Sequence, residues 1–185
     1  MKKILLAAGL MALVAHAQAS IILFDLQGRA GVGLLGGNEF PAAVVGGGSG
    51  GELPGGIFYD DVTDMLTINI GWGSANGFTD LTANTTAGHL HGPASMNQSA
   101  GVKYGLNALP GWNPSATAGG FNGTISILAA DEAALLNGQF YFNGHTAANP
   151  GGEIRGNLVV VPEPSVVVLG ALGAGALLLR LRRRK

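Results

Sequence analysis

Several segments of this chain alternate apolar and polar residues with a period of two, and this feature constrains the fold most strongly. Residues 66–72 place Leu, Ile, Ile and Trp at every second position, and residues 121–127 and 154–160 repeat the pattern. A period of two is typical of a β-strand with one buried face. Gly, Asn, Asp and Pro separate these segments, and further strands are expected at residues 21–27, 55–59, 88–91 and 139–145. The sequence therefore predicts an all-β domain, an Ig-like or Greek-key β-sandwich.

Two segments interrupt the strand pattern. Asp131 can cap a short helix over residues 131–137, which Gly138 would end. Residues 46–51 (Gly-Gly-Gly-Ser-Gly-Gly) are expected to form a flexible loop. The predicted domain thus contains one short helix and one glycine-rich connection.

The charge distribution excludes one class of partner. Between residues 20 and 161 there are three basic and ten acidic residues, a net charge of −7 against −1 for the whole chain. Such a surface repels nucleic acid, so we expect no nucleic-acid partner. The chain has no cysteine, which excludes disulfides and thiolate metal sites.

The N-terminal segment has the layout of a secretory signal peptide. Lys2 and Lys3 precede an apolar run over residues 4–14, and Ala17-Gln18-Ala19 fits a small-x-small cleavage site. We expect signal peptidase to cut between Ala19 and Ser20. Residues 1–19 are then the signal peptide, and the β domain spans residues 20–160.

The C-terminal segment, residues 161–185, forms a separate module. The motif Val161, Pro162, Glu163, Pro164 stops any preceding strand, residues 165–179 are apolar, and residues 180–185 are mostly Arg. A basic cluster after a transmembrane helix keeps that end cytoplasmic. These parts resemble the PEP-CTERM sorting signal of Gram-negative bacteria. The resemblance implies exosortase as a partner, transient anchoring in the inner membrane, and release to the periplasm, cell surface or medium.

The histidines are the strongest candidates for a site. His89 and His91 are two residues apart on a predicted strand, so both rings point to the same face, and His145 ends another predicted strand. Three converging imidazoles would suit Cu or Zn. Alternatively, these side chains hydrogen-bond loop backbone and have a structural role only.

Other motifs are weaker. Gly31 to Gly36 has the spacing of a dinucleotide-binding loop, but Pro41 follows and no helix can begin there. Asp60, Asp61 and Asp64 lack the EF-hand pattern for Ca²⁺, and we interpret them as a solvated hairpin turn. No nucleophile elbow is present, and no catalytic residue is assigned.

Three runs of the predicted β domain resemble the CHRD domain family. They are Asn38-Glu39-Phe40-Pro41, the run from His89 to Ala94 (HLHGPA), and the run from Gly138 to Gly156 (GQFYFNGHTAANPGGEIRG). The last run is long and specific, and the resemblance covers about residues 22–160. One departure is the single proline after Phe40, where the family usually has Glu-Val-Pro-Pro. The resemblance implies an extracellular, β-sandwich-like module with no established enzymatic activity.

The order of His89, His91, His145 and Arg155 also resembles copper-zinc superoxide dismutases, which are Greek-key β-sandwiches. This resemblance implies that the imidazoles bind Cu and that the guanidinium of Arg155 steers a small anion. The bridging histidine, the zinc ligands and the disulfide cysteines are absent, which argues against dismutase activity. A mononuclear three-histidine copper site stays as a hypothesis.

Two functions follow from these patterns. The first is a non-catalytic binding or matrix role outside the cell, with exopolysaccharide or another extracellular protein as partner. The second is a copper-binding, redox-active metalloprotein that uses His89, His91 and His145. Metal content separates them.

Overall fold

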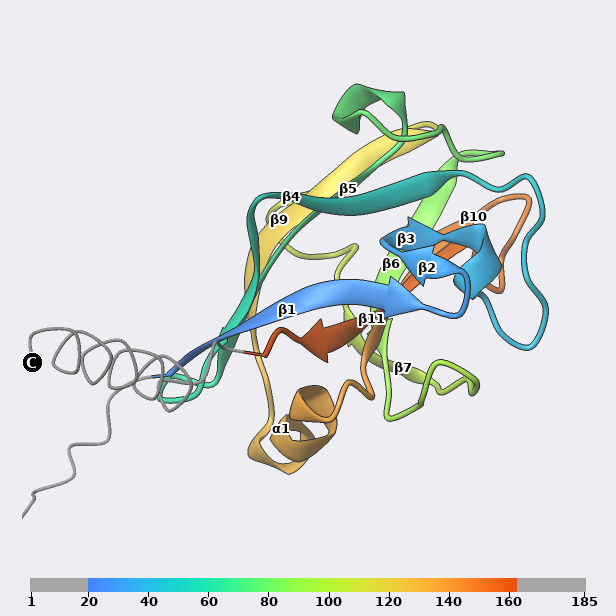
Figure 1. Ribbon diagram of the computed structural model, residues 1–185. Coiled ribbons are helices and arrows are strands. Elements are labelled where there is room, and N and C mark those ends of the chain that lie inside the picture. Colours follow the sequence, from blue (N-terminus) through green and yellow to red (C-terminus); the bar gives the residue numbers. More distant parts are fainter. Residues whose placement is uncertain (1–19, 163–185) are drawn as a thin grey trace, which may run out of the picture.

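The computed structural model describes residues 20–162 of the chain (Figure 1). The elements are, in chain order, β1 (Ile21–Gly28), β2 (Gly31–Val32), β3 (Leu34–Leu35), η1 (Gly36–Asn38), β4 (Ser49–Asp60), β5 (Met65–Trp72), η2 (Ser74–Asn76), β6 (Thr85–His91), β7 (Val102–Gly105), β8 (Trp112–Ser115), β9 (Ala118–Ser126), α1 (Ala129–Leu136), β10 (Tyr141–Thr146) and β11 (Ile154–Val160). The predicted signal peptide and most of the predicted sorting tail, with its transmembrane helix, lie outside the described residues. Within residues 20–162, no helix has the length and apolar character needed to cross a membrane.

The strands form one antiparallel sheet, whose main path runs β7-β6-β10-β11-β1-β4-β5-β9-β8. Two short strands lie off this path: β2 pairs with β1, and β3 pairs with β11 and β4. The sheet folds over (Figure 1), and the buried side chains of β6, β10 and β11 belong to one core with those of β5 and β9. The all-β, sandwich-like prediction is confirmed, although the two layers belong to one continuous sheet.

Aromatic side chains join the two halves of the sheet. The ring of Trp72 on β5 lies 5.2 Å from that of Trp112 on β8 and 6.0 Å from that of Phe142 on β10, between centroids. The indole N–H of Trp72 also donates to the hydroxyl of Thr85 at the start of β6, at 3.2 Å. Gly88 on β6 leaves room for Trp112, because an added Cβ would overlap the indole ring. Packing against the two tryptophans thus fixes the position of β6 from the core side of the sheet.

The predicted strands are present, with two differences. Each of the seven predicted segments overlaps a strand, but β4 begins at Ser49, inside the predicted flexible loop. That prediction is wrong for residues 49–51, because β3 and β5 pair with this stretch from its two sides. The sequence pattern also misses the short strands β2, β3, β7 and β8.

Helix α1 begins two residues earlier than predicted. Leu128 occupies the N-cap position and gives no side-chain cap, so the predicted capping role of Asp131 is wrong. Asp131 instead lies in the first turn, where it accepts a hydrogen bond from the Tyr104 hydroxyl (2.7 Å) and pairs with Lys103 (2.8 Å). The predicted end is confirmed, since Gly138 follows the helix with a positive φ of 71°.

Strands β10 and β11 are buried on both sides. Ile154 and Leu158 point into the core, whereas Arg155 and Asn157 point the other way and are only 1% and 0% exposed. A half-buried strand over residues 154–160 was expected from the alternation, and that expectation is wrong. The opposite side of β6, β10 and β11 carries polar residues that two loops cover. We call it the polar face; its residues are His89, His91, Tyr141, Asn143, His145, Arg155 and Asn157.

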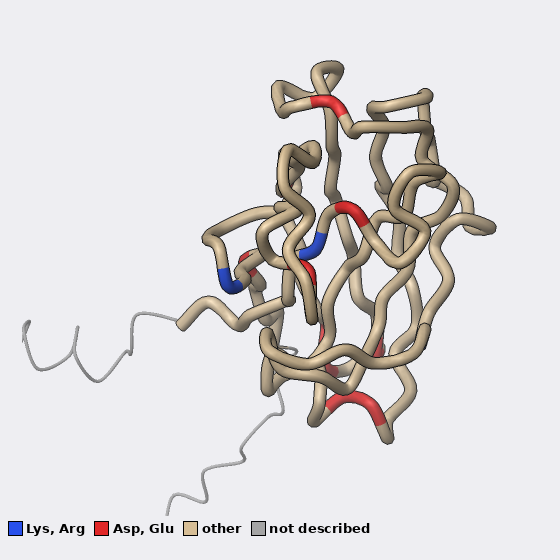
Figure 2. The backbone as a smooth tube through the Cα atoms, turned by 90° about the vertical axis from the view of Figure 1, so that its right-hand side faces the viewer, with Lys and Arg blue, Asp and Glu red and all other residues tan. Residues whose placement is uncertain are grey.

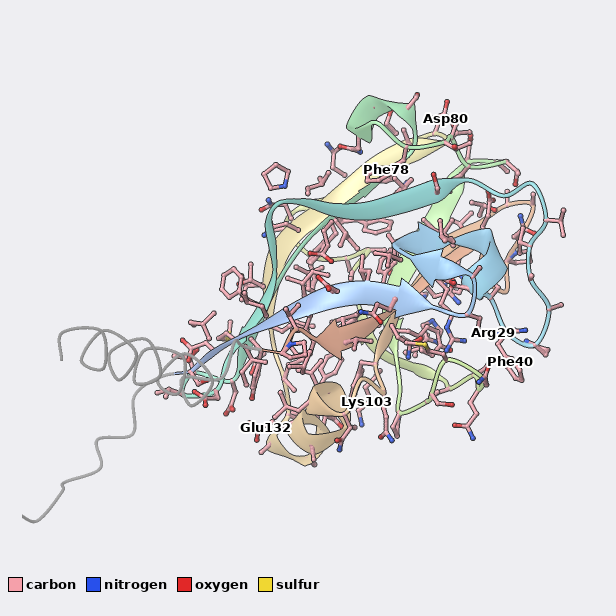
Figure 3. The ribbon with its side chains drawn as sticks, viewed as in Figure 1. Arg29, Phe40, Phe78, Asp80, Lys103 and Glu132 are labelled. Carbon is pink, nitrogen blue, oxygen red and sulfur yellow. The ribbon has the colours of Figure 1, made fainter. Side chains whose placement is uncertain are left out.

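The first covering loop follows η1. Arg29 donates to the carbonyl of Glu39 at 3.1 Å and lies over the Phe40 ring, with 5.5 Å from Cζ to the ring centroid (Figure 3). The second covering loop spans residues 92–101, and Ser99 joins the two loops by donating to the carbonyl of Phe40 at 2.8 Å. Together the loops exclude solvent from much of the polar face.

Charged residues are sparse and mostly acidic, as the sequence predicts (Figure 2). Among residues 20–162, Lys103 and Asp131 form the one ion pair. The charged side chains that are fully buried, Glu153 and Arg155, both lie on β11 or directly before it.

Candidate metal centre

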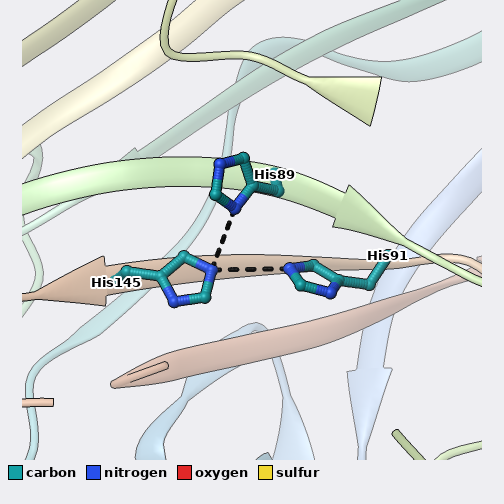
Figure 4. Close-up of side chains that lie close together, drawn as sticks. All are labelled: His89, His91 and His145. Atoms are coloured by element: carbon teal, nitrogen blue, oxygen red, sulfur yellow. Dashed lines mark hydrogen bonds between the residues drawn. The ribbon is translucent and has the colours of Figure 1, made fainter. Parts of the chain in front are cut away.

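The structure brings His89, His91 and His145 together on the polar face (Figure 4). His89 and His91 lie on β6 and His145 on the adjacent β10, where Asn143 pairs with His89. Nδ1 of His89 lies 3.1 Å from Nε2 of His145, and Nε2 of His91 lies 3.4 Å from the same atom. His91 and His145 are each 8% exposed, and His89 is half-buried. The predicted convergence of the three rings is therefore observed, with one ring open to solvent.

Backbone carbonyls fix the orientation of the two buried rings. Nδ1 of His91 lies 2.9 Å from the carbonyl of Ala100, and Nδ1 of His145 lies 3.0 Å from that of Pro150. A carbonyl oxygen can only accept, so both Nδ1 atoms carry hydrogen and both Nε2 atoms carry a lone pair. Those two lone pairs face each other across 3.4 Å. They cannot hydrogen-bond to one another. Nε2 of His145 accepts a hydrogen bond from Nδ1 of His89 in the tautomer that carries hydrogen on that atom; in the other tautomer all three nitrogens offer lone pairs to one electron-pair acceptor.

All three imidazoles are neutral at neutral pH, because their pKa values lie below the ordinary 6.5. Burial, with smaller contributions from the nearby His89 and His91, lowers the pKa of His145 to about 4, and the hydrogen bond to Pro150 opposes this shift. Burial is also the main cause of the lowered pKa of His91 and of His89, where hydrogen bonds to Ala100 and to the Asn107 side chain respectively oppose it. Neutral imidazole is the form that binds metal ions.

The spacing of the nitrogens fits a single ion. Two nitrogens that each lie 2.0–2.1 Å from one ion are at most about 4.2 Å apart. The separations of 3.1 and 3.4 Å lie within this limit, and all three ligand atoms lie within 4.8 Å of one another. Side-chain movements of less than about 1 Å would therefore let one ion contact all three.

The same residues fall inside a recognised domain. A family model described as CHRD domain matches residues 31–158, which is more than half of the chain. The chain belongs to the CHRD domain family. No curated protein and no solved structure matches it. The likeness to superoxide dismutases stays a prediction.

The CHRD domain places Arg155 beside the histidines but away from solvent. Its guanidinium is 1% exposed, lies 3.6 Å from the Tyr141 ring centroid, and donates to the carbonyl of Ser95 at 2.9 Å. In this position the side chain holds the second covering loop against the sheet. An anion arriving from solvent would not contact it, so the anion-steering role that the resemblance implies does not fit the buried position of Arg155.

Several residues that support the site carry no sequence signal of their own. The Tyr141 ring stacks on His91, with centroids 5.1 Å apart, and its hydroxyl hydrogen-bonds the backbone of Ala100. Glu153 is 0% exposed and holds the loop that carries Pro150. Both residues lie in the long run that carries the family resemblance. The match of residues 138–156 to the family was the one sequence signal that included Tyr141 and Glu153, but it did not show whether these residues have a structural or a binding role.

The remaining predicted sites are placed as follows. Asp60, in the turn between β4 and β5, accepts hydrogen bonds from the amides of Val62 and Thr63, which agrees with a solvated hairpin turn. Among residues 20–162, the histidine cluster alone groups three or more potential metal ligands. Ser20, Val161 and Pro162 lie at the two ends of the described part, whereas Ala19, Glu163 and Pro164 lie outside it.

Proposed function

We propose that this CHRD domain is an exported, non-catalytic metal-binding module that holds one copper ion on His89, His91 and His145. The observation that carries the proposal is the pair of inward-facing Nε2 lone pairs, 3.4 Å apart, on rings whose outer nitrogens are bound to backbone carbonyls. Carbonyl partners on the outer nitrogen are the usual second layer of a histidine metal site.

Copper fits the donor set better than other common ions. The cluster offers imidazole nitrogen only, without a carboxylate or a thiolate. Imidazole suits Cu and Zn, and Cu²⁺ has the highest affinity among the divalent first-row ions for a given site. The net charge of −7 between residues 20 and 161 also favours a cation near the domain.

The terminal segments support export. A signal peptide with cleavage after Ala19 implies signal peptidase as a partner, and the tail beginning at Val161 implies exosortase and a transient anchor in the inner membrane. We therefore propose a final location at the periplasm, cell surface or outside the cell. The mass of the chain recovered from each cell fraction tests both cleavage events.

The test of the metal site is copper retention by the full chain. The protein is purified in detergent without a polyhistidine tag, loaded with Cu, desalted and analysed for metal. We expect about one equivalent of Cu per chain, lost in the double variant His89→Gln, His145→Gln. Thr86→Ala, an exposed change on β6, is the matched control and should retain the ion. Sub-stoichiometric copper in a folded wild-type protein would contradict the proposal.

A matrix role rests on the sorting tail rather than on the domain. Gram-negative bacteria with such tails often make exopolysaccharide, and binding of the purified protein to that polymer tests this prediction. Binding that survives the double histidine variant would show that the matrix role and the metal site are separate.

A further inference from the structure

A buried positive charge lies one aromatic ring away from the histidine cluster. Strand β10 runs between β6 and β11, and the Tyr141 ring on β10 contacts both neighbours: it stacks on His91 of β6, and the Arg155 guanidinium of β11 lies over it. The Arg155 guanidinium is 3.6 Å from the Tyr141 centroid, and that ring is nearly parallel to His91, with 15° between the planes. A guanidinium stays protonated at any physiological pH. The cluster therefore has a fixed cation near His91, on the other side of the Tyr141 contact.

No carboxylate neutralises this charge at contact distance. Within residues 20–162 the one ion pair joins Lys103 and Asp131, so Glu39 does not form one with Arg155 although both are buried. The carboxyl of Glu39 is instead approached by the Asn143 amide at 3.4 Å, and Nε of Arg155 has no hydrogen-bond partner. Burial raises the pKa of Glu39 to about 7, against the opposing effects of Arg155 and Asn143, so part of its charge is absent at neutral pH.

The ligand set adds no negative charge of its own. Three neutral imidazoles leave the full charge of a bound ion in place, and burial of His91 and His145 limits screening by water. Repulsion from a fixed cation grows in proportion to the charge of the ion, so it is twice as large for a divalent as for a monovalent ion.

We infer that the site selects monovalent copper, Cu(I), over Cu(II) and Zn(II), and that Arg155, acting through Tyr141 and His91, is the positioning residue that sets this preference. The inference rests on the proposed function, since it concerns the same three-histidine site. Binding of Cu(I) changes no oxidation state and breaks no protein bond, so the preference is a difference in affinity between ions and needs no electron donor.

Arg155 also has a structural role, which the test must separate from its charge. Its donation to Ser95 holds the covering loop that carries Ala100, the partner of His91. Arg155→Lys keeps the charge and loses the forked donor, whereas Arg155→Gln loses the charge and keeps a polar donor. If the role of Arg155 is purely structural, both variants should weaken the binding of Cu(I), Cu(II) and Zn(II) by the same factor. A charge effect predicts a change in the ratio of affinities in Arg155→Gln only.

The experiment measures Cu(I), Cu(II) and Zn(II) affinities of the full chain by competition with chelators, at about pH 6, which lies below the raised pKa of Glu39. For wild type we expect tighter binding of Cu(I) than of either divalent ion. In Arg155→Gln the Cu(II) affinity should gain about tenfold relative to Cu(I). For a one-electron couple this corresponds to a reduction potential lower by about 59 mV. Arg155→Lys should keep the wild-type ratio.

Each outcome separates the two proposals. If wild type binds none of the ions, the proposed function fails. If it binds Cu(II) or Zn(II) more tightly than Cu(I), or if the ratio is the same in Arg155→Gln, the metal site stands and the inference is overturned. An equal shift in Arg155→Lys would also overturn it. Should Arg155→Gln not fold, the wild-type potential decides, because a value below that of the aqueous copper couple contradicts a stabilised Cu(I) state.

Discussion

Glu153 holds three loops of the domain through one buried carboxylate, and its replacement by Gln is the sharpest test of the fold. The side chain is 0% exposed. Oε1 accepts from the amides of Gly48 (3.0 Å) and Thr82 (2.7 Å). Oε2 accepts from the hydroxyls of Thr82 and Thr146 (both 2.7 Å) and from the Asn149 amide (3.1 Å). All five donors lie in connecting segments or at a strand end.

The size of the effect follows from what an amide can replace. Gln keeps one oxygen, which serves best in place of Oε1, because the amides of Gly48 and Thr82 cannot act as acceptors. The hydroxyls of Thr82 and Thr146 can rotate to accept from the new NH₂ group, but the Asn149 amide loses its carboxylate acceptor and keeps the 3.2 Å bond to the Thr82 hydroxyl alone. Hydrogen bonds to a charged group contribute about 1.5–3 kcal/mol each, and a buried unpaired donor costs about 1–3 kcal/mol. We expect Glu153→Gln to lower the free energy of unfolding by about 3 kcal/mol.

Urea unfolding of the metal-free protein, followed by tryptophan fluorescence, measures this loss. Asp25→Asn on β1, which removes a carboxylate of similar formal charge, should change stability by about 0.5 kcal/mol or less. A loss below about 1 kcal/mol for Glu153→Gln would refute the reasoning, because the five contacts would then contribute no more than exposed ones.

The pH dependence gives an independent check on the same residue. Burial alone would raise the pKa of Glu153, but the hydrogen bonds from Gly48, Thr146 and Thr82 outweigh it and lower the pKa below the ordinary 4.5. The unfolded chain therefore takes up the proton first as pH falls. The contribution of Glu153 is fully present above about pH 5 and is lost as pH drops below 4.5 toward the folded pKa. Glu153→Gln should lack this component of acid destabilisation.

Three further predictions concern the strands and loops around the histidines. Gly88→Ala should destabilise the domain by about 1–3 kcal/mol in urea unfolding, since the new methyl group would overlap the Trp112 ring; wild-type stability would show that the ring can move aside. Asn38→Ala should cost about 2–4 kcal/mol by the same assay, because this 1% exposed amide accepts from Ala30 (2.8 Å) and donates to Gly33 (3.1 Å) and Arg155 (2.9 Å) backbone atoms. A loss under about 1 kcal/mol would contradict it. Copper loading, followed by metal analysis across pH, should persist well below 6.5, because burial lowers the pKa of all three histidines and brings that of His145 to about 4. Protons compete only as pH falls toward those values, so half-loading at or above 6.5 would argue against this site.

Local sequence pattern was enough for the seven longer strands and for two of the three histidines, but it missed the short strands β2, β3, β7 and β8. The predicted strand over residues 88–91 correctly places His89 and His91 on one face, because side-chain direction along a strand depends on position alone. The approach of His145 depends on the register between β6 and β10, in which Asn143 pairs with His89 across 54 positions of sequence. Sequence spacing carries no such register, so it could suggest that the three rings converge but could not establish it.

The buried polar face was out of reach for a related reason. Alternating polar residues in a strand usually point to solvent, and nothing local in residues 154–160 distinguishes Arg155 or Asn157 from exposed residues. Their burial depends on two loops far away in the chain, which reach them through contacts such as that of Arg155 with Ser95. Long-range contacts also determine the position of Asp131. Its carboxylate binds Tyr104 and Lys103, so this residue, although typical of helix caps, lies in the first turn of α1 and not at its N-cap.

The first and last strands of the domain lie side by side and run in opposite directions, with Phe24 opposite Val160 and the Val161 amide bonded to the Leu23 carbonyl at 2.9 Å. The chain therefore enters and leaves the domain at neighbouring points. A unit with this geometry can be inserted into a surface loop of another protein without forcing the two ends of that loop apart. Several copies of the domain can also follow one another in a single chain, joined by short linkers. Because β1 pairs with β11, the domain can be inserted into another protein as one unit, and the three histidines are transferred with it.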